Sequence, residues 1–361
     1  MADTISFARG APSLDIVDVE GLKAAAVAAF DRDPGGTTAY GTAVGYVPLR
    51  RWIAEKHGVP ESQVIVTNGS MQADAFLFDS VVGDGDAVIV ERPTYDRTLL
   101  GLRERGADIR MVELQQDGID TDALEALLEG GLRPSLAHII PNFQNPAGYT
   151  LSLAKREALL ALSAKYGFTL FEDDPYIDIR FTGEPLPTML SMNDGSASVV
   201  YASSFSKTVC PGIRCGYLVG PEDLIAQIVR RATNTYISPD MVAQSIVYDF
   251  CASGRIGQSI ATVKTALKER CATLTSALAR ELPEASFTAP EGGYFMWVEL
   301  PEGTSVDALF SAAAQRGLQF VKGTDFLLEG GENTLRIAYS GVTPEQIDEG
   351  VRRLAEAYRS L

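Results

Sequence analysis

Residues 201–220 read YASSFSKTVCPGIRCGYLVG, and this stretch carries the most specific chemical signal in the chain. Lys207 comes just after a strand-like apolar run, follows several hydroxyl residues and precedes Arg214 by seven positions. A lysine amine that is desolvated near another cation has a lowered pKa, and imine formation requires the neutral amine. Most lysines are solvated surface charges, but Pro211, Gly212 and the apolar surroundings favour a buried position here. We therefore interpret Lys207 as a candidate nucleophilic amine.

This stretch ends a region, from about residue 60 to residue 220, in which short β-branched apolar runs alternate with amphipathic stretches. Such alternation is typical of an α/β fold with βα units around a mostly parallel sheet. The seven candidate strands are QVIVTN, DAVIVERP, DIRMVEL, LAHIIPN, FTLFEDD, SVVYASS and RCGYLVG. Nearly all the distinctive polar residues directly follow these runs, and ligands of open α/β sheets bind beyond the carboxyl ends of the strands. The sequence therefore predicts a site at that edge of the sheet.

The pattern changes after about residue 220 to long helical stretches, among them the segment from Gly257 to Leu282. Strand-like runs such as YFMWVEL and NTLRIAYS follow, before a closing helix from about Pro344. We expect a smaller α+β domain there, onto which an N-terminal arm could pack. The predicted division is 1–35 for the arm and part of the small domain, 36–250 for the large domain and 251–361 for the small C-terminal domain.

The composition excludes several classes of function. With 46% hydrophobic and 22% charged residues the chain is an ordinary globular protein. A formal charge of −16 makes a nucleic-acid or anionic-membrane partner unexpected, because no net positive field attracts phosphates. An anionic ligand must therefore be held by a few placed arginines and backbone N–H groups. No metal is expected, because His57 and His138 lie in no cluster with metal-ligand spacing and are interpreted as structural.

The cysteines and the first residues predict a cytoplasmic location. Cys210, Cys215, Cys251 and Cys271 are too sparse for a disulfide scaffold and form no C-x-x-C pair, so buried thiols are expected. The start, MADTISFARGAPS, has no basic segment followed by an apolar core, as a secretory signal would. The apolar run from Ala24 to Phe30 is far too short to span a bilayer.

Ser-Phe-Ser-Lys followed by Pro-Gly-Ile-Arg-x-Gly-Tyr resembles the lysine motif of the class I/II, fold type I aminotransferases that use pyridoxal phosphate (PLP). The chain is most similar to the branch that contains aminoadipate, kynurenine and aromatic aminotransferases, and to the effector domains of MocR-type regulators. The likeness extends from Tyr40 to Arg336. It implies the fold type I PLP-transferase fold, with a seven-stranded, mostly parallel sheet between helices, and a PLP aldimine at Lys207.

Two further motifs supply the expected partners of the cofactor ring. In EDDPYIDIRF, Asp173 and Tyr176 match the family's Asp-x-x-Tyr, which implies that Asp173 pairs with the pyridine nitrogen and that Tyr176 donates to the phenolic oxygen. Asp174 is the alternative for the first role, and an acidic pair after a strand also suits a turn or a helix cap. Asn145, in Asn-Pro-Ala-Gly, would donate to the same phenolic oxygen; the family commonly has Thr where this chain has Ala147.

The phosphate is expected at the start of a helix in VTNGSMQADAFLF, where free N–H groups and the helix dipole attract anions. An isolated Ser70 would be read as a helix cap. The residues expected around the phosphate are Ser70, Met71, Gln72, Ser204, Ser206 and Arg214. By resemblance Tyr95, in ERPTYDRT, stacks on the ring, although a packed core tyrosine is the alternative. Tyr40, in TTAYGTAVGYVPLRRWI, would reach the phosphate of the partner subunit, which implies a homodimer with shared active sites.

The substrate is expected between the arm and a late strand. Arg336, in NTLRIAYS, resembles the family's Asn-x-x-Arg that grips the substrate α-carboxylate, although a strand-edge salt bridge is the alternative. In ISFARGAPS the neighbourhood of Gly10 would line the substrate pocket. Close relatives often carry Gly where this chain has Arg9, so Arg9 is a hypothetical contact for a distal carboxylate; a solvent-facing arm residue is the alternative.

The function implied by the resemblance is transfer of the amino group of an α-amino acid to a 2-oxo acid, with Lys207 as general base and general acid. One alternative is another PLP reaction on the same scaffold, such as elimination, replacement, condensation or oxidation. The other is a ligand-sensing domain like that of the MocR regulators, which would predict an additional N-terminal DNA-binding domain. We disfavour it, because the arm starts almost at residue 1 and the charge is acidic.

Overall fold

The computed structural model describes residues 4–361 and is built around an eight-stranded sheet of order β2-β9-β8-β7-β6-β3-β4-β5. Its strands are β2 (Val64–Thr67), β3 (Ala87–Arg92), β4 (Asp108–Gln115), β5 (Gly118–Ile119), β6 (Leu136–Ile139), β7 (Thr169–Asp173), β8 (Ser198–Ser204) and β9 (Gly216–Val219). All seven predicted strands are present, and the two-residue β5 extends one edge. The pairings from β4 to β8 are parallel, whereas β9 is antiparallel to β2 and β8, and β5 is antiparallel to β4.

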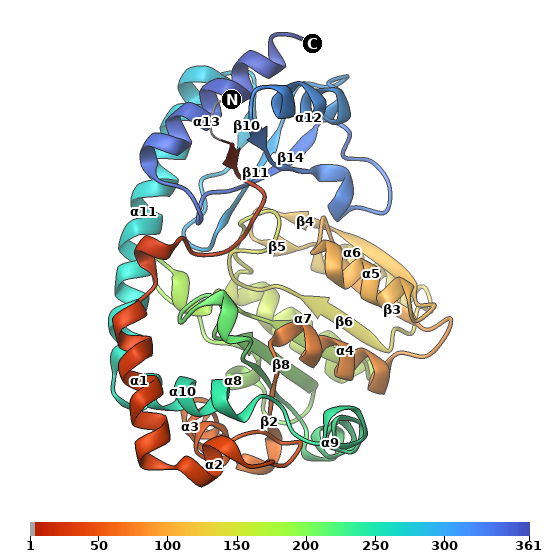
Figure 1. Cartoon of the computed structure of the whole chain (residues 1–361). Coiled ribbons are helices and arrows are strands. Elements are labelled where there is room, and N and C mark those ends of the chain that lie inside the picture. The colour runs from red at the N-terminus through yellow and green to blue at the C-terminus, as the bar shows by residue number, and fades with distance from the viewer. Residues whose placement is uncertain (1–3) are drawn as a thin grey trace.

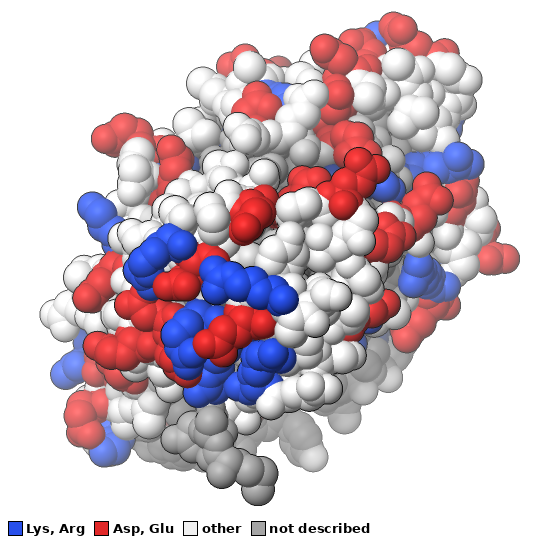
Figure 2. Space-filling view, turned by 90° about the horizontal axis from the view of Figure 1, so that it is seen from above, with Lys and Arg blue, Asp and Glu red and all other residues white. Residues whose placement is uncertain are grey.

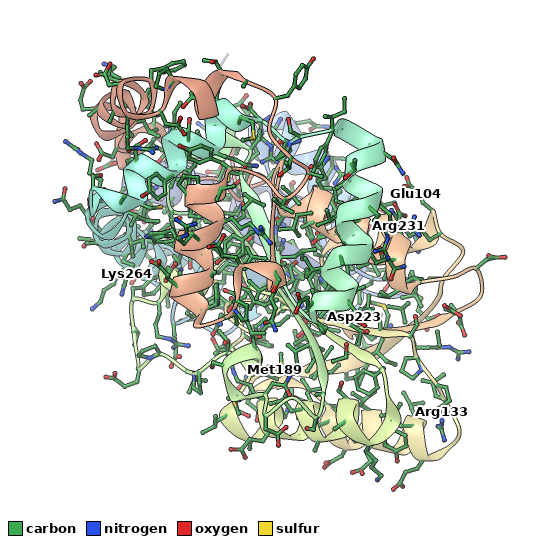
Figure 3. The ribbon with its side chains drawn as sticks, turned by 90° about the horizontal axis from the view of Figure 1, so that it is seen from below. Glu104, Arg133, Met189, Asp223, Arg231 and Lys264 are labelled. Atoms are coloured by element: carbon green, nitrogen blue, oxygen red, sulfur yellow. The ribbon has the colours of Figure 1, made fainter. Side chains whose placement is uncertain are left out.

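Helices cover both faces of this sheet, because successive strand side chains point to opposite sides and both sides are apolar. In β7, Phe171 belongs to one buried cluster and Leu170 to another. The Phe171 side is covered by α4 (Ser70–Val81), α5 (Asp96–Arg103) and α9 (Glu222–Tyr236). The opposite side is covered by α3 (Val47–His57), α6 (Thr121–Glu129), α7 (Leu153–Tyr166), α8 (Met189–Met192) and α10 (Met241–Ala252). Figure 3 views these layers from below, with Asp223 and Arg231 marking α9 and Met189 marking α8.

A second, antiparallel sheet of order β10-β11-β14-β13 lies above the first in Figure 1. Its strands are β10 (Ser286–Phe287), β11 (Phe295–Glu299), β13 (Val321–Lys322) and β14 (Thr334–Ala338). Its core is shared with α11 (Arg255–Glu281), α12 (Val306–Gln315) and α13 (Pro344–Tyr358). Helix α11 is long and runs beside both sheets (Figure 1).

The first residues join these two parts of the molecule. Strand β1 (Ile5–Ser6) pairs in parallel with β12 (Leu318–Gln319), and α1 (Val19–Arg32) packs on α10. Helix α2 (Pro34–Thr38) then leads to α3. Short 3-10 turns lie at Leu14–Ile16, Glu61–Gln63, Ile177–Ile179, Pro211–Ile213 and Gly323–Phe326. The domain boundaries at 1–35, 36–250 and 251–361 stay predictions.

Charged side chains of both signs lie on the surface. Acidic and basic side chains are intermixed over the face seen from above (Figure 2).

Between residues 4 and 361, no helix combines the length and the apolar character that crossing a membrane requires.

Candidate active site

A cavity of about 450 Å³ opens at the carboxyl ends of the parallel strands, where the sequence predicted a site. Its walls come from the turns after β2, β3, β6, β7 and β8, from the arm at residues 8–10, and from β11, β13 and β14. Segments that are far apart in the sequence therefore meet in one space between the two sheets. Most of the predicted site residues line this space.

Lys207 reaches the cavity from a turn that follows β8. Its Nζ donates a hydrogen bond of 2.6 Å to the carbonyl of Gly10 in the arm. Burial, followed by the positive charges of Arg336 and Arg214, lowers the pKa of Lys207 to about 8. Roughly a tenth of the amine is therefore neutral at pH 7, far more than for a solvated lysine, and imine formation requires this neutral form.

Asp173 is the last residue of β7 and lines the cavity. It is 5% exposed, and its Oδ2 lies 3.3 Å from Nε2 of His138. Its Oδ1 is buried and has no hydrogen-bond partner among residues 4–361. The alternative, Asp174, does not line the cavity, and its Oδ2 accepts a hydrogen bond of 2.7 Å from Asn142. The alternation of side chains along the chain separates the two carboxylates, so Asp173 is the one with a free oxygen at the cavity.

Asn145 and Arg336 both line the cavity and contact each other. Nη1 of Arg336 donates to Oδ1 of Asn145 at 2.8 Å, and Nη2 donates to the carbonyl of Ala8 at 2.7 Å. The guanidinium also lies over the rings of Phe295 and Phe326. Its Nε is buried and unpartnered within the described chain. Arg336 is thus held in place with bonding capacity left for an anion.

Tyr176 and Tyr95 contribute two rings to the cavity wall. Burial raises the pKa of Tyr176 well above its usual range, so its hydroxyl stays protonated and can donate. Burial, followed by the negative charge of Asp96, raises the pKa of Tyr95 to about 12. Tyr95 lies just before α5 and, as predicted from ERPTYDRT, follows strand β3.

The start of α4 forms an anion cradle together with the turn after β8. Its N-cap is Gly69 (φ +86°), without a capping side chain, and helical bonding begins only with the N–H of Gln72, which donates to the Gly69 carbonyl. The N–H groups of Ser70 and Met71 are therefore open to a ligand. Ser204 Oγ donates to Ser206 Oγ at 2.9 Å, and Nη1 of Arg214 lies 3.4 Å from the Ser206 hydroxyl. Two N–H groups, two hydroxyls and a guanidinium suit a phosphate.

A family model for aminotransferase class I and II matches residues 2–354. The chain belongs to this family. It is 34% identical to the 2-aminoadipate transaminase of Thermus thermophilus (99% of this chain, 90% of the other) and 30% identical to aromatic-amino-acid aminotransferase 1 of Thermococcus litoralis (99% and 88%). The crystal structure of alpha-aminoadipate aminotransferase from Thermus thermophilus, in complex with N-(5'-phosphopyridoxyl)-L-leucine, is similar with a TM-score of 0.94 and 32% identity, over 99% and 92% of the two chains.

The family assignment confirms the resemblance inferred from the lysine motif, the fold type I fold and the enzyme class. The protein is an aminotransferase, and the expected amino-group transfer and the expected cofactor, PLP, are confirmed with it. Enzymes of this kind act on amino acids and 2-oxo acids. The roles of individual residues stay predictions.

Two predicted residues lie outside the cavity of this aminotransferase chain. The side chain of Gln72 turns back and accepts from the N–H of Asn68 at 2.9 Å, while its own N–H is used inside the helix. Gln72 therefore supports the start of α4, and its backbone N–H is not free for a ligand. Tyr40, between α2 and α3, is 86% exposed and does not line the cavity of its own chain.

The arm residues Arg9 and Gly10 both line the cavity. A Cβ on Gly10 would lie 2.2 Å from the ring of Phe295, so only glycine allows the arm to lie this close to β11. Arg9 is exposed at the rim, as is Arg97 in the first turn of α5.

His138 and Asp74 are the residues of the site that the sequence did not reveal. His138 was interpreted as structural, yet it lies buried beside Asp173 and between the rings of Phe78 and Phe171. Asp74, in the second turn of α4, lines the cavity and is 8% exposed. Only the order β7-β6 in the sheet, which a single sequence does not state, brings His138 next to Asp173.

Proposed function

We propose that this aminotransferase moves the amino group of an α-amino acid to a 2-oxo acid, with PLP held at Lys207. The observation that carries the proposal is the partly neutral amine of Lys207, whose pKa is about 8, in a cavity that also contains the free oxygen of Asp173. An amine with a pKa of about 8 has a neutral fraction near pH 7, and this neutral form serves both as a nucleophile and as a base.

The residues around the cavity fit PLP in three respects. The unpartnered Oδ1 of Asp173 suits the N–H of a pyridinium ring. The N–H groups of Ser70 and Met71, the hydroxyls of Ser204 and Ser206 and the guanidinium of Arg214 suit its phosphate. Tyr176 and Asn145 offer donors for its phenolic oxygen, and the ring of Tyr95 offers a stacking surface.

When bound, PLP supplies a carbonyl that condenses with amines and a ring that accepts the electrons left by deprotonation at Cα. Lys207 would hold the cofactor, and its Nζ would remove the Cα proton of the bound substrate. Arg336 binds the α-carboxylate in a two-point grip and thereby orients the Cα–H bond toward Lys207. Asp173 keeps the ring nitrogen protonated, with His138 fixing the orientation of its carboxylate.

The proposed substrates are α-amino acids with long side chains. The similar enzymes are named for 2-aminoadipate and for aromatic amino acids, which share an α-carboxylate but differ in charge at the far end. Arg9 at the rim of the cavity supports a substrate or acceptor with a distal carboxylate.

The proposed assembly is a homodimer with shared active sites. The exposed ring of Tyr40 supports it, because the side chain does not serve its own cavity. A cytoplasmic location is part of the proposal and is supported by four free cysteines.

The test is the absorption spectrum of the purified protein during addition of single amino acids. We expect a visible cofactor band that an amino-acid substrate removes with release of its 2-oxo acid, and that 2-oxoglutarate or pyruvate restores. The Lys207→Ala variant should lose both changes. Products of elimination in place of the 2-oxo acid would point to the alternative PLP chemistry, and the absence of any PLP-dependent band would refute the proposal.

A further inference from the structure

A second carboxyl group shares the cavity with Asp173. Asp74 lies in the second turn of α4, lines the cavity and is 8% exposed. Its Oδ1 is buried and has no hydrogen-bond partner in the described part of the chain. Asp74 also lines a smaller cavity of about 250 Å³ between α4 and α5, so it stands between two spaces without a fixed partner in either.

The surroundings of Asp74 favour its protonated form. Burial, followed by the negative charge of Asp173, raises the pKa of Asp74 well above its usual range. Besides Asp173, the ionisable groups that line the two cavities are Arg9, Tyr95, Asp96, Arg97, Glu104, Arg105, Tyr176, Lys207, Arg214 and Arg336. Arg105 is paired with Asp79 at 2.6 Å, and Nε of Arg97 lies 3.5 Å from Asp96. Among the described residues none of these cations forms an ion pair with Asp74, so burial and the charge of Asp173 favour the protonated carboxyl, which is a hydrogen-bond donor.

The two carboxyl groups could form a donor–acceptor pair. Asp173 has one oxygen near His138 and one free acceptor oxygen, whereas Asp74 has a donor without an acceptor. A buried polar group without a partner destabilises a fold. No hydrogen bond or ion pair on α4, within the described residues, accounts for the acid at position 74. The side chains of Ala73 and Leu77 on the same helix pack in the apolar cluster under the sheet.

We propose that Asp74 is a further cofactor-site residue, whose neutral carboxyl donates a hydrogen bond within the cavity to the free edge of Asp173 and so keeps Asp173 as the ionised partner of the ring nitrogen. The inference rests on the proposed function, because it requires PLP with its ring nitrogen at Asp173. Asp74 acts through Asp173 and is a positioning residue. It explains why a helix that begins at the phosphate cradle carries a buried acid one turn later.

The test compares Asp74→Asn, which keeps a donor but cannot ionise, with Asp74→Leu, which has similar size and no donor. PLP is titrated into each protein after removal of the cofactor, and the pH midpoint of the bound cofactor's visible band is recorded. We expect Asp74→Leu to bind PLP about tenfold more weakly, as for loss of a hydrogen bond to a charged group, and to shift the pH midpoint. Asp74→Asn should stay within about twofold of the wild type in affinity, because its amide still donates.

Thermal unfolding of the cofactor-free proteins separates this role from a structural one. Both variants should unfold at the same temperature as the wild type or higher, because each removes an unpartnered buried acid. Ser80→Ala, on the same helix but outside both cavities, is the matched control and should bind PLP like the wild type.

Wild-type affinity and an unchanged pH midpoint in Asp74→Leu would overturn the inference while the wild type still binds PLP. Equal destabilisation by Asn and Leu, with no change in the bound cofactor, would overturn it in favour of a structural role. A wild-type protein without a cofactor band would refute the proposed function itself.

Discussion

The behaviour of Lys207 depends on the groups that surround its amine. Burial has the largest effect on its pKa, Arg336 and Arg214 lower it further, and Asp173 opposes them. A solvated lysine has a pKa of about 10.4, whereas the site lowers the pKa of Lys207 to about 8 and so favours the neutral amine. The two arginines that are proposed to bind the carboxylate and the phosphate thus also activate the nucleophile.

This shift predicts the pH dependence of PLP uptake by the cofactor-free protein. Because only the neutral amine reacts, the rate should rise about tenfold per pH unit below pH 8 and level off above it. The measurement is the growth of the cofactor band after mixing with excess PLP at a series of pH values. A rate that continues to rise to about pH 10, as for a solvated lysine, would contradict the inferred environment.

Arg9 predicts a difference between substrates. Removing its guanidinium in Arg9→Ala should weaken the apparent affinity for amino acids with a distal carboxylate by about tenfold, because a charge-assisted hydrogen bond is lost. Substrates with neutral side chains should be affected little. The measurement is kcat/KM for one acidic and one aromatic amino acid. Arg103→Ala, in the last turn of α5 and outside the cavity lining, is the control. Equal loss for both substrates would count against the role of Arg9.

At the residue scale, the sequence predicted side chains that lie within short motifs. Lys207 and Asn145 follow strand-like runs, Asp173 and Arg336 lie within such runs, and all four have recognisable neighbours and line the cavity. His138 has no such motif; its position beside Asp173 follows from the pairing of β6 with β7. Contacts of this kind depend on strand order, which one sequence does not contain.

At the scale of elements, the start of α4 depends on its support by β9. Strand β9 pairs with β2, and a Cβ on Gly216 would lie 2.5 Å from the backbone nitrogen of Ser70. Glycine therefore allows the helix start to rest directly on the strand that follows Arg214. The cradle is built from backbone packing as much as from side chains.

Gly216→Ala should displace the start of α4 and weaken PLP binding by about tenfold or more, with an overpacking cost of about 1–3 kcal/mol in stability. PLP titration and thermal unfolding measure the two effects. Gly212→Ala is the matched control, because a Cβ there meets no heavy atom within 4 Å. Wild-type PLP affinity in Gly216→Ala would show that the close packing of β9 against the start of α4 is not needed for PLP binding.

The predicted elements were accurate where periodicity is strong. The seven predicted strands of the eight-stranded sheet all lie where apolar runs predicted them, because their buried faces leave a clear pattern. Strand β5 and the β1–β12 pair are each two residues long and leave no periodic signal. The antiparallel direction of β9 was not predicted either, since side-chain alternation is the same in both directions.

At the scale of the whole molecule, the arm joins the two sheets through the site. The backbone of residues 8–10 accepts hydrogen bonds from both Lys207 and Arg336, while Ala338 of β14 donates to the carbonyl of Phe7. A displacement of the arm would therefore break hydrogen bonds of both Lys207, the proposed base, and Arg336, the proposed carboxylate ligand. The proposed substrate binding and the position of the arm would be coupled for that reason.

The surface near Tyr40 indicates where a second copy would bind. Helices α1, α2, α3 and α10 gather at one end of the molecule (Figure 1). Exposed apolar side chains come from these elements and from the turn before α10; they are Phe30, Val47, Ile237 and Val242. Burial of such side chains between two copies would stabilise a dimer and would bring Tyr40 into a neighbouring cavity.

A shared site predicts complementation between two defective subunits. Lys207→Ala lacks the base, and Tyr40→Phe lacks the hydroxyl proposed to reach the partner's phosphate. In a mixed dimer the site that keeps Lys207 receives an intact Tyr40 from its partner, so one of the two sites is complete. Equal mixing, with subunit exchange, should restore about a quarter of wild-type activity, because about half of the dimers are mixed. If Tyr40 instead served its own chain, that site would lack the hydroxyl and mixing would give only the average of the two variants. Activity measured against mixing ratio, with the dimer followed by sedimentation, distinguishes the two arrangements.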